Sequence, residues 1–195
     1  MPAPIPWSSL EESCKASWLW KTATEDLRDH LSHLIVVASG DKPKLELAKS
    51  LTQAVAAILL ACPAAIGVSW GKHGLLVPQK VFIRFATEIL PHDFPIQVWI
   101  DFRVGRTEDG ASFGFTCGMD GFDLMEFEAL NAKEPPVELR NRLWSLASYL
   151  LENGPVIMDG NTVGRDAREK IRVRYSPSSF GNEQQVMRLV WEYSK

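Results

Sequence analysis

The chain has 195 residues, of which 46% are hydrophobic and 23% charged, and its formal net charge is −3. This balance is typical of a globular protein with a substantial core, and it excludes a disordered chain. The slightly acidic charge argues against general nucleic-acid binding, which needs a basic surface to displace counterions.

Cysteine usage and the N-terminal residues bear on location. Cys14, Cys62 and Cys117 are odd in number and far apart, without zinc-finger spacing, so we expect reduced thiols in a cytoplasmic protein. The opening MPAPIPW has no basic residue and no apolar helix, so no secretory signal is expected. Residues 50–71 carry no charge, but Pro63 interrupts them, which favours a buried helix and strand over a membrane span.

The first third of the chain predicts an arm, two short helices and a strand. Residues 2–7 contain three prolines and are expected to be extended, whereas 8–20 and 24–33 carry helix-start signals. Residues 34–39, LIVVAS, open with five apolar residues, which predicts a strand covered on both faces.

The middle of the chain predicts helix, strand and helix. Apolar residues recur at three- and four-residue steps over 45–62 and predict a helix that Pro63 ends. Residues 65–70 predict a second buried strand, and 78–88 a further helix.

Beyond residue 95 the apolar period changes from helical to two. Residues 96–105 and 112–118 predict a hairpin whose second strand turns Phe113, Phe115 and Cys117 toward the core. In the first strand a solvated face is expected to carry Gln97, Trp99, Asp101 and Arg103.

The last third predicts a long helix over 137–154 and strands over 170–176 and 185–193. The sequence therefore predicts one α+β (mixed α/β) domain over residues 1–195. Its central sheet is expected to be mostly antiparallel with helices on one or both faces, and residues 1–30 to be an N-terminal arm and short helix packed on it.

The segment TCGMDGFDLMEFE, residues 116–128, gathers four carboxylates, and their spacing is not that of a calcium loop. We interpret its glycines as a tight exit from the preceding strand, followed by a helix with Glu126 in its first turn. A partner-binding acidic patch, and catalysis or metal binding, are the alternatives. The four acidic residues are Asp120, Asp123, Glu126 and Glu128.

Two further patterns are weaker. His30 and His33 share a helix face and offer a metal pair, but a helix-end histidine explains each of them more simply. The loop MDGNTVGRD, residues 158–166, has the composition of a phosphate-binding loop without the P-loop lysine, and Arg165 belongs to it. We interpret it as a turn, with a ligand-binding loop as the alternative. No cofactor and no metal are expected.

Surface charge is segregated along the chain. Residues 111–154 carry three basic and seven acidic side chains, and 155–195 carry seven basic and five acidic ones. Such segregation permits electrostatic steering of a partner, although the solvated face of an antiparallel sheet is the simpler explanation. The candidate partner-binding residues are Trp99, Asp101, Arg103, Asp120, Asp123, Glu126, Glu128, Arg172, Arg174 and Arg188.

The order of several motifs resembles an uncharacterised bacterial domain-of-unknown-function family met near type VI secretion and polymorphic-toxin genes. The matching pieces are PAPIPW, SWLW, LRDHLSHLIVVAS, TCGMDGFDLMEFE and DGNTVGR. The family pattern TxGxxxFxxxExE corresponds to Thr116, Gly118, Phe122, Glu126 and Glu128, and the resemblance attaches no reaction to it.

Together these observations favour a non-enzymatic protein-binding module. The resemblance points to an immunity or accessory protein that binds and neutralises a secreted toxin. The alternatives are a hydrolase or transferase using residues 120–128 with His30 or His33, and a chaperone-like adaptor for a secreted effector. We expect a protein partner, and neither nucleic acid nor a membrane.

Overall fold

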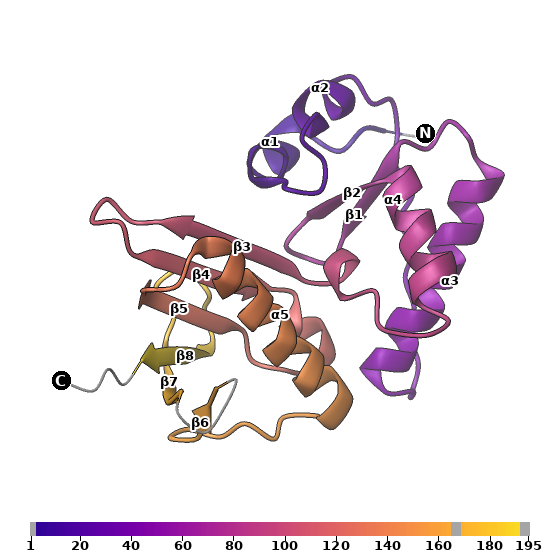
Figure 1. Cartoon of the computed structure of the whole chain (residues 1–195). Coiled ribbons are helices and arrows are strands. Elements are labelled where there is room, and N and C mark those ends of the chain that lie inside the picture. Colours follow the sequence, from indigo (N-terminus) through magenta and orange to yellow (C-terminus); the bar gives the residue numbers. More distant parts are fainter. Residues whose placement is uncertain (1–2, 165–168, 192–195) are drawn as a thin grey trace. The chain divides into compact units, whose positions relative to one another are not determined.

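The computed structural model describes residues 3–164 and 169–191 (Figure 1). The chain divides into two compact units, unit 1 (Met1–Trp99) and unit 2 (Ile100–Lys195). Unit 1 has most of the helices and a two-stranded sheet, and unit 2 has a six-stranded sheet with a long helix. The predicted α+β class is therefore confirmed.

Unit 1 is built mainly from helices. Its first helices, α1 and α2, pack with β2 through buried side chains that include Leu10, Leu27 and Leu76. No helix among the described residues is both long and apolar enough to cross a membrane. The elements in chain order are α1 (Trp7–Ala16), α2 (Ala23–Arg28), α3 (Lys44–Ala61), β1 (Gly67–Trp70), β2 (Leu75–Pro78), α4 (Gln79–Arg84), a π-turn (Phe85–Ile89) and a 3₁₀ turn (Ile96–Val98).

The N-terminal arm is tied to the end of α2 by His30. The backbone N–H of Ile5 donates to Nε2 of His30 at 2.8 Å, and Nδ1 of the same ring lies 2.7 Å from the carbonyl oxygen of Leu27. The carbonyl needs a donor, so the ring carries its proton on Nδ1. Both ring nitrogens are therefore used within unit 1.

The prediction of a buried strand at 34–39 is wrong. These residues belong to no helix or strand, and the side chains of Leu34, Ile35 and Val37 are exposed. A strand that is buried on both faces normally lies inside a sheet, with a neighbouring strand on each side. In unit 1 the two strands β1 and β2 pair with each other.

The prediction that Trp99 lies on a solvated strand face is also wrong. The chain forms a 3₁₀ turn at Ile96–Val98, and the strand starts only at Asp101. The Trp99 side chain is 1% exposed, its ring packs against Phe94, and its Nε1–H donates to Oγ1 of Thr52 at 2.8 Å. A buried indole with its N–H paired is a core anchor of unit 1, not a partner-binding residue.

Unit 2 is a six-stranded mixed sheet in the order β3-β4-β5-β8-β7-β6, in which β5 and β8 are parallel and the other pairs antiparallel. The elements are β3 (Asp101–Arg106), β4 (Ser112–Cys117), a 3₁₀ turn (Met119–Phe122), β5 (Phe127–Ala132), α5 (Pro136–Asn153), β6 (Thr162–Val163), β7 (Ile171–Pro177) and β8 (Gln185–Trp191). The predicted helix at 137–154 and the mostly antiparallel sheet are confirmed.

Helix α5 packs on one face of this sheet and fixes which residues of β4 face the core. A Cβ atom at Gly114 would lie 3.1 Å from side-chain atoms of Leu139 and Leu143, so glycine lets α5 approach β4 without displacing these side chains. Ser112, Gly114 and Thr116 are consequently the buried residues of β4. The predicted inward orientation of Phe113, Phe115 and Cys117 is reversed, because the small residues are the ones that accommodate the helix.

A buried arginine connects α5 to the loops beside it. Arg142 makes two hydrogen bonds to Glu134, at 2.7 and 2.8 Å, and two to Glu169, at 2.6 and 3.0 Å. Burial acts to lower the pKa of Arg142, but the hydrogen bonds and charges of the two glutamates outweigh it and raise the pKa. The guanidinium therefore stays charged and is held by both glutamates.

Replacing Arg142 by Ala should destabilise the protein by about 3 kcal/mol, because two carboxylates would lose their partner in a buried setting. Urea unfolding measures the effect. Arg106→Ala is the matched control, because Arg106 is exposed and donates a hydrogen bond to the carbonyl oxygen of Gly110. Equal effects of the two changes would contradict a structural role for the buried arginine.

Candidate functional site

Most of the predicted partner-binding residues of unit 2 lie on the sheet face that points away from α5, which we call the distal face. Because Gly114 faces α5, its neighbour Phe115 faces away. Phe115 is in register with Arg103 on β3 and with Glu128 on β5. The row continues through Arg188 on β8 to Arg174 on β7.

Glu128 is the anchor of this face. Its side chain is 2% exposed, and Nη2 of Arg188 lies 3.1 Å from Oε2. The hydroxyl of Ser178 donates to Oε1, and the backbone N–H of Ser179 lies 3.0 Å from Oε2. The carboxylate thus fixes the start of the β7–β8 loop over β5, as a buried charge requires partners of this kind.

The same loop places an aromatic ring on the distal face. Phe180 stacks on Phe115 with 4.4 Å between ring centroids and on Phe113 with 5.6 Å. The guanidinium of Arg103 lies 5.9 Å from the Phe115 centroid, within cation–π range. The three rings are only partly buried, so the face combines aromatic and cationic groups, as protein interfaces do.

Arg103 and Asp101 form an ion pair at the β3 edge, 2.8 Å between Nε and Oδ2. Burial acts to lower the pKa of Arg103, but the hydrogen bond and charge of Asp101 outweigh it and raise the pKa.

On β7, Nη1 of Arg172 donates to the carbonyl of Gly160 at 3.1 Å. Arg174 is more exposed and lies 3.5 Å from Asp159.

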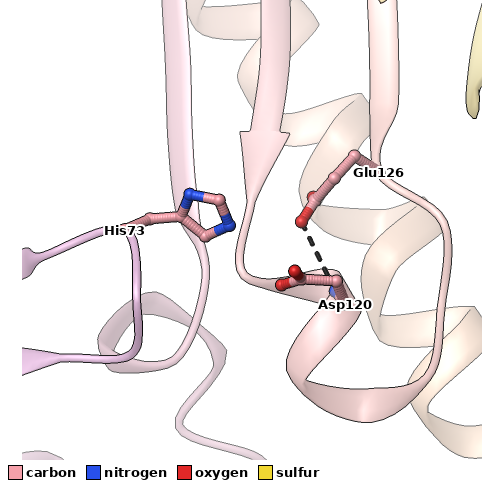
Figure 2. A group of neighbouring side chains, drawn as sticks. All are labelled: His73, Asp120 and Glu126. Atoms are coloured by element: carbon pink, nitrogen blue, oxygen red, sulfur yellow. Dashed lines mark hydrogen bonds between the residues drawn. The ribbon is translucent and has the colours of Figure 1, made fainter. Parts of the chain in front are cut away.

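Glu126 performs a different structural task. Its Oε2 accepts from the hydroxyl of Thr116 at 2.6 Å, and its Oε1 accepts from the backbone N–H of Gly118 at 2.7 Å. Figure 2 shows the third bond, which the backbone N–H of Asp120 donates to Oε1 of Glu126 at 3.4 Å. The figure also draws His73, a residue of unit 1. The carboxyl group therefore holds the turn that follows β4 against the start of β5.

The prediction that residues 120–128 start a helix is wrong. Gly118 has φ of 117° and Asp123 φ of 59°, and between them lies a 3₁₀ turn, after which the chain enters β5. The prediction of a glycine-assisted turn at this point is confirmed. Asp123 is exposed, whereas Glu126 and Glu128 are buried; Glu126 therefore stabilises the turn rather than a helix N-terminus.

The thiol beside this turn is not arranged as a nucleophile. Burial, followed by the charge of Glu126, raises the pKa of Cys117 to about 12. A thiol needs a lowered pKa to react as thiolate at neutral pH. Cys117 therefore acts as a small side chain that packs beside this turn.

The remaining sequence candidates have local structural roles. His30 has both ring nitrogens occupied, and Nδ1 of His33 lies 2.7 Å from the carbonyl of Ala3. In the 158–166 loop Asn161 accepts from the backbone of Met158 at 2.8 Å, and Gly160 has φ of 82°, which confirms the predicted turn. Arg165 lies outside the described residues.

Ser178, Ser179 and Phe180 were not singled out by the sequence. Their contribution depends on the return of the β7–β8 loop over β4 and β5, a contact across fifty residues. The sequence indicated this contact only through Glu126 and Glu128, two acidic residues spaced two apart. Carboxyl groups on a half-buried strand need hydrogen-bond partners from other parts of the chain.

Comparison with known families finds DUF4261, a domain of unknown function, at residues 115–190. The match runs from Phe115 in β4 to Val190 in β8 and so includes both buried glutamates. It confirms that a domain of unknown function is present in this region. Comparison with curated proteins and comparison with solved structures each gave no match.

The carboxyl group of Glu126 provides a pH test. Burial raises its pKa above the ordinary value of 4.5, although its hydrogen bonds act in the opposite direction. The folded protein then binds more protons than the unfolded chain, so this group's contribution to stability falls as the pH rises through that range. Relative to Glu126→Gln, the wild type should lose unfolding free energy as the pH rises above 4.5 and through the raised pKa of the folded state.

Urea unfolding at several pH values measures this difference. Glu152→Gln, at an exposed position of α5, is the control for the removal of one carboxyl group. A wild type that gains stability over Glu126→Gln as the pH rises would show that the pKa of Glu126 is lowered instead.

Thiol labelling tests the assignment of the cysteines. Cys62 is exposed, whereas Cys14 is buried with a raised pKa and Cys117 has the raised pKa given above. A thiol reagent at neutral pH should modify Cys62 rapidly and the other two only after unfolding. Mass spectrometry of Cys62→Ser checks this: fast labelling of Cys117 in the native variant would restore it as a candidate nucleophile.

Proposed function

We propose that this protein is a non-enzymatic protein-binding module, most concretely an immunity or accessory protein that binds and neutralises a secreted bacterial toxin in the cytoplasm. The observation that carries the proposal is the distal face of unit 2. It combines stacked aromatic rings with arginines on a rigid sheet, and aromatic residues and arginine are the types enriched at binding hot spots.

The arginines of the distal face differ in what they offer a partner. Arg103 is held by Asp101, and Arg188 by Glu128, so each is positioned before any partner arrives. Arg174 is exposed beside them, and its contact with Asp159 is long. A partner with an acidic surface would meet pre-oriented guanidinium groups, which reduces the entropy cost of binding.

The alternative of a hydrolase or transferase has less support. Glu126 accepts three hydrogen bonds that close the turn after β4, and Glu128 accepts bonds from a loop and an arginine. A general base must be within reach of a substrate proton. Glu126→Gln and Glu128→Gln separate the readings, because an enzyme would lose activity without losing stability.

The alternative of a chaperone-like adaptor for a secreted effector uses the same face. The difference is the fate of the partner, which an adaptor releases in a folded, active state and an immunity protein keeps inactive. Recovery of partner activity after the complex forms distinguishes these two outcomes.

The protein should form a complex of nanomolar or higher affinity with the product of the gene next to its own, measured by calorimetry with both purified proteins. Arg174→Glu should weaken that complex at least about tenfold by reversing a charge on the distal face. Arg84→Glu, at an exposed position of α4 in unit 1, is the matched control.

Thermal unfolding of both variants establishes that they are folded. The proposal fails if no complex forms at micromolar concentration, and the distal face is the wrong surface if the two charge reversals have equal effects.

A further inference from the structure

The contact between the N-terminal arm and α2 depends on the protonation of one histidine in unit 1. The backbone N–H of Ile5 can only donate, so Nε2 of His30, 2.8 Å away, must accept with its lone pair. A neutral imidazole carries its proton on the other nitrogen, and Nδ1 of His30 lies 2.7 Å from the carbonyl oxygen of Leu27. The two contacts together require the neutral form of His30, with the proton on Nδ1.

Protonation of His30 removes the contact with Ile5. The second proton binds at Nε2 and uses the lone pair that the N–H of Ile5 needs, so that two donors would face each other at hydrogen-bond distance. The contact with Leu27 persists, because Nδ1 carries a proton in both forms. The protonated ring therefore stays bonded to α2 while it loses the arm.

The arm has few other main-chain donors that could replace this bond. Among residues 3–6 only Ala3 and Ile5 have a backbone N–H, because Pro4 and Pro6 lack one. The side chain of Ile5 is partly buried and packs against the apolar cluster that α1, α2 and β2 form, whereas its neighbours Pro4 and Pro6 are more exposed. Ile5 is thus the residue through which the arm is held.

The second histidine of this region behaves differently. Nδ1 of His33 lies 2.7 Å from the carbonyl oxygen of Ala3, an atom that can only accept, so this ring nitrogen donates. A nitrogen that carries a proton in the neutral imidazole still carries it after protonation. The contact between His33 and Ala3 therefore survives at acidic pH, and of the two histidine contacts only that of His30 is lost.

The other ionisable groups of these elements keep their charge in the range where histidine titrates, about pH 5 to pH 8. The arm, residues 3–6, and β2 have none. On α2, the carboxylate of Asp26 accepts two side-chain hydrogen bonds, and Arg28 lies over the Trp7 ring. On α1, Lys15 pairs with both glutamates of that helix. The remaining groups, all exposed to solvent, are Lys21, Glu25 and Asp29.

We propose that His30 is a pH-sensitive latch, which holds residues 3–6 on α2 in its neutral form and releases them in its protonated form. Release uncovers the part of the apolar cluster on which Ile5 packs. The latch lies wholly within unit 1, and it is independent of the function proposed for the distal face of unit 2.

Hydrogen exchange followed by NMR tests the latch in the whole protein. The readout is the protection factor of the Ile5 amide, which corrects for the intrinsic effect of pH on exchange. This factor should fall at least about tenfold between about pH 8 and about pH 5, because the amide loses its acceptor. The amides of α3, in the same unit, should keep their protection, because the release is local.

His30→Gln separates the latch from other effects of pH. The Gln side-chain oxygen can take the place of Nε2 and accept from Ile5 at every pH, so the protection of Ile5 should no longer depend on pH. His33→Gln is the matched control, in which the fall in protection should persist. Should His30→Gln leave Ile5 unprotected even at pH 8, the wild type decides: the midpoint of the Ile5 amide shift should coincide with that of the His30 imidazole.

Each outcome supports or overturns the latch. Constant protection of Ile5 over this pH range overturns it, as does an Ile5 amide that is unprotected in the wild type at pH 8. A fall in protection that His30→Gln retains, or that His33→Gln abolishes, also overturns it, and so does an Ile5 midpoint that differs from that of His30. Loss of protection in α3 together with Ile5 would assign the change to unfolding of unit 1 instead.

Discussion

Two carboxyl groups buried two residues apart at β5 are the constraint on which much of unit 2 depends. A buried carboxyl group is tolerated only when hydrogen bonds or charges compensate the loss of water. Glu126 obtains them from Thr116 and from the turn after β4, and Glu128 from Arg188 and the β7–β8 loop. The pair therefore ties together β4, β5, β7 and β8, the part of the chain in which the domain of unknown function is found.

The close approach of α5 decides which face of the sheet is available for binding. The helix packs onto Gly114, where a Cβ atom would press against Leu139 and Leu143, and the aromatic residues of β4 lie on the distal face. There Phe180 completes the stack, and the β7–β8 loop that carries it is held by Glu128. Packing on one side of the sheet and the proposed recognition surface on the other thus have a common origin.

The distal face of unit 2 presents charges and aromatic rings that contacts within the unit already hold in place. Groups fixed in this way would give the proposed binding its orientation and specificity.

Local chemistry in the sequence determined the helices at α3 and α5, the hairpin of β3 and β4, the alternation in β7, and the glycine turn after β4, because apolar period, proline and glycine act over a few residues. Only the tertiary structure decided that Trp99 is buried against Thr52, that Glu126 and Glu128 find partners at distant positions, and that the apolar run after α2 stays unpaired. Those outcomes depend on which segments contact each other. The spacing of apolar residues within one segment does not identify the segment that packs against it.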